Sequence, residues 1–183
     1  MGQLQLREEE IFKTLNKILK YKFVLIGGYS VNAYTLPRFS IDCDIVVKDK
    51  LELNKIEKEL KKLEYKKEKY SGRPSYHGGF LRYEKEIRAN FKVSVDILFD
   101  KILDRQTNSI FDADWVFENS KIREINGKTI QNKLKLRVIN VDSLIVMKMV
   151  SCRSTDIRDV FMLIPKAENV GWIKQEVSSK YNF

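Results

Sequence analysis

The segment IGGYSVNAYTLPRFSIDCDIVV, residues 26–47, constrains the fold more than any other part of this chain. The apolar run FVLI that leads into it ends at Gly27-Gly28, as a buried strand ends at a turn. YSVNAYTL then suits a short helix that stops before Pro37, and Cys43–Val47 is a second apolar run. The segment predicts two strands of an α/β sheet joined by a short helix.

Two aspartates, Asp42 and Asp44, lie at the start of the second strand. The strand period of two sends both carboxylates to one face and Cys43 to the other. Carboxylates that close repel each other, so a divalent cation or a basic neighbour is the natural counter-charge. Mg²⁺ prefers one or two carboxylates, completed by phosphate oxygens and water. The pair therefore indicates either a metal site or a polar strand edge at a turn.

A third acid, Asp96, lies inside the otherwise apolar stretch Val93–Leu98. Burying a lone carboxylate is costly, so Asp96 needs a partner. If its strand lies beside the first two aspartates, three acids converge and could hold two metal ions about 4 Å apart. The alternative is an ion pair with Arg88 or Lys92.

Three further features suit an anionic ligand. Glycines between a strand and a helix let the backbone approach a phosphate, although the pair Gly27-Gly28 alone is often just a tight turn. Arg38, close to the acids, could touch phosphate or cap the loop. Lys148 lies in the middle of an apolar helix, so its ammonium extends to the surface or meets an anion, which could be a triphosphate, a catalytic aspartate or a structural partner.

The rest of the chain predicts further helices and strands. A charged amphipathic helix follows the aspartates, and a loop over residues 71–79 holds His77, the only histidine. FLRYEKE and NFKVSVDILF suit a β-ribbon, and Asn126-Gly127 suits a two-residue hairpin turn between KIREI and KTI. From Asp142 the pattern is helical, with Ile157, Val160, Phe161 and Ile164 on one face of a helix and a last helix over 171–179. We therefore expect an α/β domain over residues 1–140 and a helical tail packed on it over residues 141–183.

Composition indicates a globular chain with a polyanionic partner. The 183 residues are 43% hydrophobic and 32% charged, and the formal net charge is +9. A basic surface favours RNA, DNA or a nucleotide, although a Lys-rich soluble protein would show the same balance. We expect a cytoplasmic protein, because neither a signal core nor a run of about 20 apolar residues is present.

These residues resemble the DNA polymerase β-like nucleotidyltransferase superfamily. GGYSVNAYTLPRFSIDCDIVV is most similar to its AbiEii/AbiGii toxin-type and lincosamide-nucleotidyltransferase-like branch. DSLIVMKMVSCRSTDIRDVFML is similar to the helical K…R-x-x-D-x-x-D…L signature of that branch. The resemblance covers roughly residues 20–165 and implies an α/β (α+β) nucleotidyltransferase fold, a mixed sheet flanked by helices with a small C-terminal helical segment.

The resemblance also implies an activity, the Mg²⁺- or Mn²⁺-dependent transfer of a nucleoside monophosphate from an NTP to an acceptor hydroxyl. The acceptor would be RNA (a tRNA end in particular), a small molecule or a protein, and a small antitoxin-like protein would be a partner. A catalytically degenerate module that binds nucleotide or RNA is the alternative. One departure is bulky Tyr29, which stands where relatives carry a small hydroxyl residue. The implied metal ligands and catalytic residues are Asp42, Asp44 and Asp96, and the implied nucleotide-binding residues are Gly27, Gly28, Ser30, Arg38 and Lys148.

Overall fold

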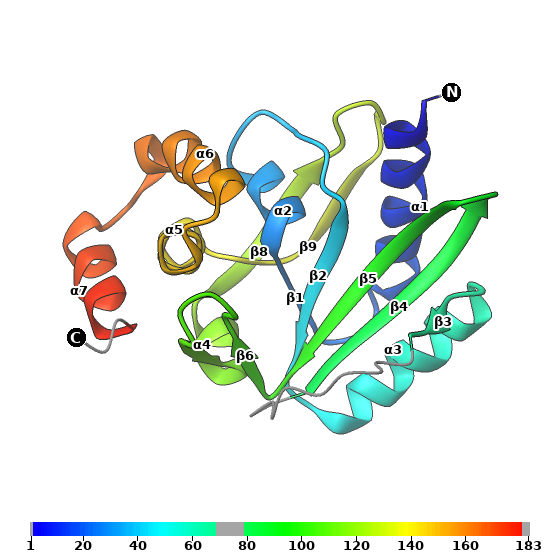
Figure 1. Cartoon of the computed structure of the whole chain (residues 1–183), viewed down its shortest axis with the longest axis horizontal. Helices are drawn as coiled ribbons and strands as arrows, with labels where there is room; N and C mark the ends of the chain where they lie inside the picture. Colours follow the sequence, from blue (N-terminus) through cyan, green and yellow to red (C-terminus); the bar gives the residue numbers. More distant parts are fainter. Residues whose placement is uncertain (1, 69–78, 181–183) are drawn as a thin grey trace.

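A computed structural model describes residues 2–68 and 79–180 of the chain. The predicted loop over 71–79, with His77, lies outside the described residues except for Gly79. The centre of the fold is a mixed seven-stranded sheet with the strand order β3-β4-β5-β2-β1-β9-β8 (Figure 1). Its strands are β1 (Val24–Ile26), β2 (Asp42–Val47), β3 (Lys66–Lys67), β4 (Gly79–Arg88), β5 (Phe91–Phe99), β8 (Ser120–Asn126) and β9 (Lys133–Ile139). A separate ribbon pairs β6 (Lys101–Leu103) with β7 (Ile110–Asp112).

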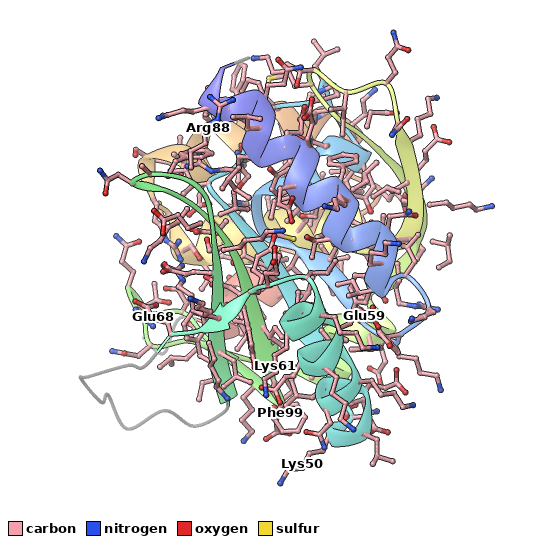
Figure 2. All side chains as sticks on the ribbon, turned by 90° about the vertical axis from the view of Figure 1, so that its right-hand side faces the viewer. Lys50, Glu59, Lys61, Glu68, Arg88 and Phe99 are labelled. Atoms are coloured by element: carbon pink, nitrogen blue, oxygen red, sulfur yellow. The ribbon has the colours of Figure 1, made fainter. Side chains whose placement is uncertain are left out.

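Helices cover both faces of the sheet (Figure 1), and each face has its own apolar core. α1 (Gln3–Ile18) and α3 (Lys50–Lys62) cover one face, onto which Figure 2 looks. On the other face lie α4 (Ala113–Glu118) and α5 (Val141–Ser151), and α6 (Ser154–Leu163) and α7 (Val170–Lys180) pack on α5. The short helix α2 (Gly27–Ser30) and the 3₁₀ turns η1 (Val31–Ala33) and η2 (Ile164–Lys166) complete the described elements. This architecture confirms the predicted fold class.

Side-chain alternation along β2 explains which face carries the acids. Cys43 and Ile45 belong to the core under α1 and α3, whereas Val46 belongs to the core under α4 to α7. Asp42 and Asp44 share the parity of Val46, so they point to the α4–α7 face. The lysine-rich α3 lies on the opposite face, away from these acids. No helix in the described part of the chain is long and apolar enough to cross a membrane.

The predicted turn at Asn126-Gly127 is wrong. The β8–β9 register pairs Asn126 with Lys133, so residues 127–132 form a longer loop and KTI is not a strand. Buried Glu8 of α1 explains the longer loop, because its carboxylate accepts hydrogen bonds from Lys128 N at 2.7 Å, Thr129 N at 2.8 Å and the Thr129 hydroxyl at 2.6 Å. In a two-residue hairpin these two backbone N–H groups would be available for hydrogen bonds between the strands, but here they donate to the Glu8 side chain.

The predicted apolar face of α6 also differs from expectation. Ile157 is 58% exposed and Phe161 is 77% exposed, whereas Asp156 and Asp159 are buried. α6 therefore turns Asp156 and Asp159 inwards together with Val160 and Leu163, and leaves Ile157 and Phe161 on the outside. The partners of these two acids provide the reason, and they lie in the site described below.

Replacing Glu8 tests the anchoring of the β8–β9 loop. We expect Glu8→Ala to lower the free energy of unfolding by about 2–3 kcal/mol, because two buried backbone donors lose a charged acceptor. Urea unfolding followed by circular dichroism measures this value. The control Glu9→Ala, one position along, should change it by less than about 0.5 kcal/mol. Equal effects of the two variants would show that Glu8 does not anchor the loop.

Candidate active site

Three neighbouring strands bring two acids and one base into a single row. β2 pairs in parallel with β5 and places Asp44 beside Asp96, and β4 pairs with β5 and places Arg82 on the other side of Asp96. Adjacent strands lie about 4.8 Å apart, so the three side chains start from neighbouring backbone positions on one face. Asp42 lies one step along the same face, opposite Ser94. The convergence of Asp42, Asp44 and Asp96 is thus a direct result of strand register.

Arg82 is the partner of Asp96. Its Nε lies 2.8 Å from Asp96 Oδ1 and its Nη2 lies 2.6 Å from Asp96 Oδ2, which is a two-pronged ion pair. The same Nη2 lies 3.5 Å from Asp42 Oδ1, and the Ser94 hydroxyl donates a hydrogen bond to that oxygen. The alternative partners proposed from sequence, Arg88 and Lys92, are wrong. Lys92 pairs with Glu84 at 2.8 Å instead.

Asp44 is the member of the row with the least compensation. Among the described residues, no hydrogen bond reaches its carboxylate, while Asp42 and Asp96 stand nearby with the same charge. Burial, and then the repulsion from Asp96 and Asp42, raises the pKa of Asp44 to about 7. Lys148 opposes that shift of the pKa. Burial also raises the pKa of Asp96 above its ordinary value, although Arg82 acts in the other direction.

The glycine pair lets other groups approach the backbone beside these acids. Gly27 has φ +66°, and a Cβ there would collide with the Asp44 carboxylate. A Cβ at Gly28 would collide with the Ser40 side chain and come within 3.2 Å of Arg38 Nη2. A side chain at either position would therefore displace Asp44, Ser40 or Arg38.

The hydroxyl beside the glycines comes from Ser40 and not from the residues directly after them. Tyr29 is fully buried in the core and packs edge-on against Phe12, with ring centroids 6.2 Å apart. Ser30 is also buried, and its hydroxyl donates to the Gly27 carbonyl at 2.8 Å. The structure therefore does not bring Ser30 to the cavity, and Tyr29 does not obstruct it. The sequence pattern includes a Ser or Thr two residues after Arg38, which is Ser40, but sequence reasoning assigned that residue no role.

α5 and α6 supply a second charged group at the same place. Lys148 Nζ lies 2.6 Å from Asp156 Oδ1 and 3.0 Å from Asp159 Oδ2. Arg38 Nη2 reaches the same Asp159 oxygen at 2.5 Å, and Asp159 is 1% exposed. One buried carboxylate thus orients two cations that come from segments 110 residues apart (positions 38 and 148). This arrangement explains why α6 buries its acidic side.

Arg153, the remaining basic residue of the helical signature, also has acidic partners. Arg153 Nη2 lies 3.4 Å from Asp104 Oδ2, and Arg153 Nε lies 3.6 Å from Asp156 Oδ2. The Ser151 hydroxyl donates to Asp104 at 2.5 Å, which ties the β6–β7 connection to the end of α5. These contacts fix the rim formed by α5 and the β6–β7 ribbon.

Two groups of charged side chains line one cavity of about 870 Å³. They are the acid row, formed by Asp42, Asp44, Asp96 and Arg82, and the α5–α6 group, formed by Arg38, Lys148, Arg153 and Asp156. That volume falls within the range of ligand sites, about 300–1,000 Å³. Apolar walls from β5, β6 and α5 adjoin the charged floor. The residues of the acid row, the glycine pair and the α5–α6 group that line the cavity are Gly27, Gly28, Arg38, Ser40, Asp42, Asp44, Arg82, Asp96, Lys148, Arg153 and Asp156. The structure therefore brings together every predicted site residue except Ser30.

The acids have the right chemistry for a divalent metal but are not gathered around one point. In the described part of the chain, no group of three or more Asp, Glu, His or Cys side chains forms a ready metal site. Both oxygens of Asp96 instead face the guanidinium of Arg82. Asp42 and Asp44 project from the same face, and burial together with the neighbouring carboxylates raises the pKa of Asp44, so a cation placed beside it would be stabilised. The donor set fits Mg²⁺ or Mn²⁺ once Asp96 is released.

Comparison with known proteins decides the family. A family model described as nucleotidyl transferase AbiEii toxin, type IV toxin–antitoxin system, matches residues 13–164, which is most of the chain. The chain belongs to this family. The match begins inside α1 and ends at η2, so it includes the acid row and the α5–α6 group of this AbiEii-family chain.

A solved structure agrees at the level of the fold. It is the crystal structure of a Thermotoga maritima protein provisionally described as a nucleotidyltransferase, with a TM-score of 0.52 and 17% identity. The match covers 87% of this chain and 95% of that one. No curated protein matches the chain. Family and fold together confirm the resemblance to the nucleotidyltransferase superfamily.

The raised pKa of Asp44 predicts how the effect of its replacement on the free energy of unfolding changes with pH. In metal-free buffer the folded protein holds a proton on Asp44 up to about pH 7, whereas the unfolded chain loses it near pH 4. The folded state binds more protons between these values, so Asp44 lowers the free energy of unfolding as pH rises from 4 to 7. Asp44→Asn should therefore gain at least about 1 kcal/mol relative to wild type between pH 4.5 and pH 8.

Urea unfolding at both pH values, in the presence of a chelator, measures this difference. Asp114→Asn serves as the control, because Asp114 is exposed and pairs only with the exposed Lys48 in the described structure. A stability difference between Asp44→Asn and wild type that is the same at both pH values would contradict the raised pKa.

Replacing Asp159 tests whether one carboxylate holds two cations. Asp159→Asn should lower the free energy of unfolding by about 3 kcal/mol, because Arg38 and Lys148 lose their shared buried counter-charge. The neighbouring Arg158→Gln is the control, because Arg158 is exposed and lies 3.9 Å from Asp159, so its loss should cost no more than about 0.5 kcal/mol. Denaturant unfolding measures both values, and a small effect of Asp159→Asn would refute the shared role.

Proposed function

We propose that this AbiEii-family chain is a Mg²⁺- or Mn²⁺-dependent nucleotidyltransferase that transfers a nucleoside monophosphate from an NTP to an acceptor hydroxyl. The observation that carries the proposal is one cavity in which three carboxylates face a group of cations and a glycine-bordered backbone. Carboxylates are good ligands for divalent metals, and basic side chains next to a glycine backbone that a phosphate can approach are suited to bind a triphosphate. Nucleotidyl transfer uses both groups at once, because its substrate is a metal-bound triphosphate.

The residues divide into two roles. Asp42 and Asp44, with Asp96 after its release from Arg82, would hold two metal ions. Bound there, the ions would neutralise charge on the attacking and leaving oxygens. Arg38 and Lys148, oriented by Asp159, would meet the β- and γ-phosphates beside Gly27 and Gly28. Ser40 is placed to donate a hydrogen bond there, in the role first assigned to Ser30.

The proposed reaction is a displacement at the α-phosphorus. The acceptor hydroxyl oxygen forms a bond to the α-phosphorus while the bond from that phosphorus to the α–β bridging oxygen breaks. The bonding electron pair leaves with pyrophosphate, and Asp96 takes the hydroxyl proton. Burial raises the pKa of Asp96, which makes this carboxylate a better proton acceptor than an exposed aspartate.

We propose RNA as the acceptor and a small antitoxin protein as the cellular partner. The formal net charge of +9 favours a polyanionic acceptor over a neutral small molecule or a protein side chain. The antitoxin follows from the family, which is described as the toxin of a type IV toxin–antitoxin system.

A second candidate function is nucleotide or RNA binding without turnover. The ion pair between Arg82 and Asp96 favours it, because a guanidinium that stays on Asp96 leaves the metal site incomplete. The two functions differ in one measurable respect, the transfer of label to an acceptor.

A transfer assay separates these candidates. The protein is incubated with Mg²⁺ or Mn²⁺, each α-labelled NTP in turn, and total RNA, a protein extract or hydroxyl-bearing small molecules. We expect label on RNA with the wild-type protein and a loss of at least about 10³-fold for Asp44→Ala, since that change removes a carboxylate shared by the metal site. Asp114→Ala should act like wild type. NTP binding without labelling of any acceptor would support the binding module.

A further inference from the structure

Arg82 is bound to Asp96, a carboxylate that the proposed reaction assigns to a metal ion. Its guanidinium contacts both oxygens of Asp96 at 2.6 and 2.8 Å and lies 3.5 Å from Asp42. Asp96 is 4% exposed, so few other groups can reach it, whereas the Arg82 side chain is 28% exposed and lines the cavity. The Arg82 side chain therefore blocks access from the cavity to Asp96, and the ion pair is not a contact on the outer surface.

A guanidinium and a divalent ion compete for the same carboxylate. Each needs the lone pairs of Asp96 that face the cavity, and a Mg²⁺ ion would approach an oxygen to about 2.1 Å. A planar guanidinium that is hydrogen-bonded to both oxygens leaves no such approach. The two cations would also repel each other at that distance. The metal can therefore use Asp96 only after Arg82 has moved away from it.

The cavity offers a moved Arg82 a new partner. Arg82 lies on the same sheet face as Asp42 and Asp44, in the cavity that also holds Gly28 and Lys148. A nucleoside triphosphate in that cavity would present several phosphate oxygens, and arginine binds phosphate in the same two-pronged way as it binds carboxylate. Nucleotide would thus offset the loss of the Asp96 contact.

We propose that Arg82 is a positioning residue that holds Asp96 in place before the substrate binds and competes with the metal for it, so that metal and NTP bind cooperatively. This inference rests on the proposed function, because it assumes that the acid row binds a divalent metal. By linkage, the NTP tightens metal binding as much as the metal tightens NTP binding. A metal ion without nucleotide would bind the site weakly, whereas the metal ion and the NTP together would bind it tightly.

Direct Mn²⁺ binding tests the inference without a measurement of activity. Free Mn²⁺ is followed by electron paramagnetic resonance as wild type, R82Q and R82K are titrated, with and without a non-hydrolysable α,β-methylene NTP. We expect R82Q without nucleotide to bind Mn²⁺ at least 10-fold more tightly than wild type, and R82K to fall between them. The phosphates of the nucleotide also ligate the ion, so the nucleotide should tighten Mn²⁺ binding to both proteins, but by a factor at least 5-fold larger for wild type than for R82Q, once the Mn²⁺ held by free nucleotide is subtracted.

Two controls assign the effect to the ion pair. R88Q removes an exposed arginine from the same strand and should bind Mn²⁺ like wild type. In a D96N background, R82Q should no longer tighten Mn²⁺ binding, because the competition for that carboxylate is gone. If R82Q does not fold, the intermediate affinity of R82K decides the same question.

The outcomes separate this inference from the proposed function. Mn²⁺ binding that is lost in D44A but is unchanged or weaker in R82Q and R82K would overturn the role of Arg82 and leave the metal site standing. A wild-type protein and an R82Q variant that bind no Mn²⁺ through Asp42 and Asp44 would overturn both.

Discussion

The parallel pairing of β2 with β5 places Asp44 beside Asp96 on a covered face of the sheet, and the rest of the site compensates for that placement. Two adjacent carboxylates in a partly buried row raise each other's free energy unless positive charge is near. Arg82 compensates Asp96, and Lys148 acts on Asp44 from α5. The remaining excess of negative charge supports the proposed role of the row as a site for a divalent cation.

A second buried acid, Asp159, orients the basic side chains of the cavity. Asp159 draws Arg38, from the loop before β2, and Lys148, from α5, to a single carboxylate oxygen. The C-terminal helices are thus joined to the sheet by charge as well as by apolar packing. α6 buries this acid together with Leu163 and leaves Phe161 exposed, so the ion-pair group contributes to the rotation of α6 along with apolar packing.

Much of this arrangement follows from the sequence, and the exceptions have identifiable causes. The strand period of two predicted that Asp42 and Asp44 share a face, and the apolar neighbours of Asp96 predicted its burial. Arg82 escaped prediction because of a β-bulge. The hairpin begins with Arg88 opposite Phe91, a register that would place Tyr83 opposite Asp96, and the irregularity between Glu86 and Arg88 shifts the pairing by one residue. Two other features also could not be predicted, because they depend on residues far apart in the sequence. These are the hydrogen bonds from the β8–β9 loop to Glu8 and the burial of Tyr29.

If the three aspartates form one metal and triphosphate site, a crystal structure of the complex shows it most directly. Crystals of the full chain would be grown with Mn²⁺ and a non-hydrolysable NTP, and the manganese would be located by anomalous scattering. We expect Mn²⁺ bound to Asp42 and Asp44, with the triphosphate between Gly28 and Lys148 and with Arg82 moved away from Asp96. Manganese and nucleotide bound elsewhere, or a nucleotide in the cavity with no metal on these aspartates, would contradict the claim.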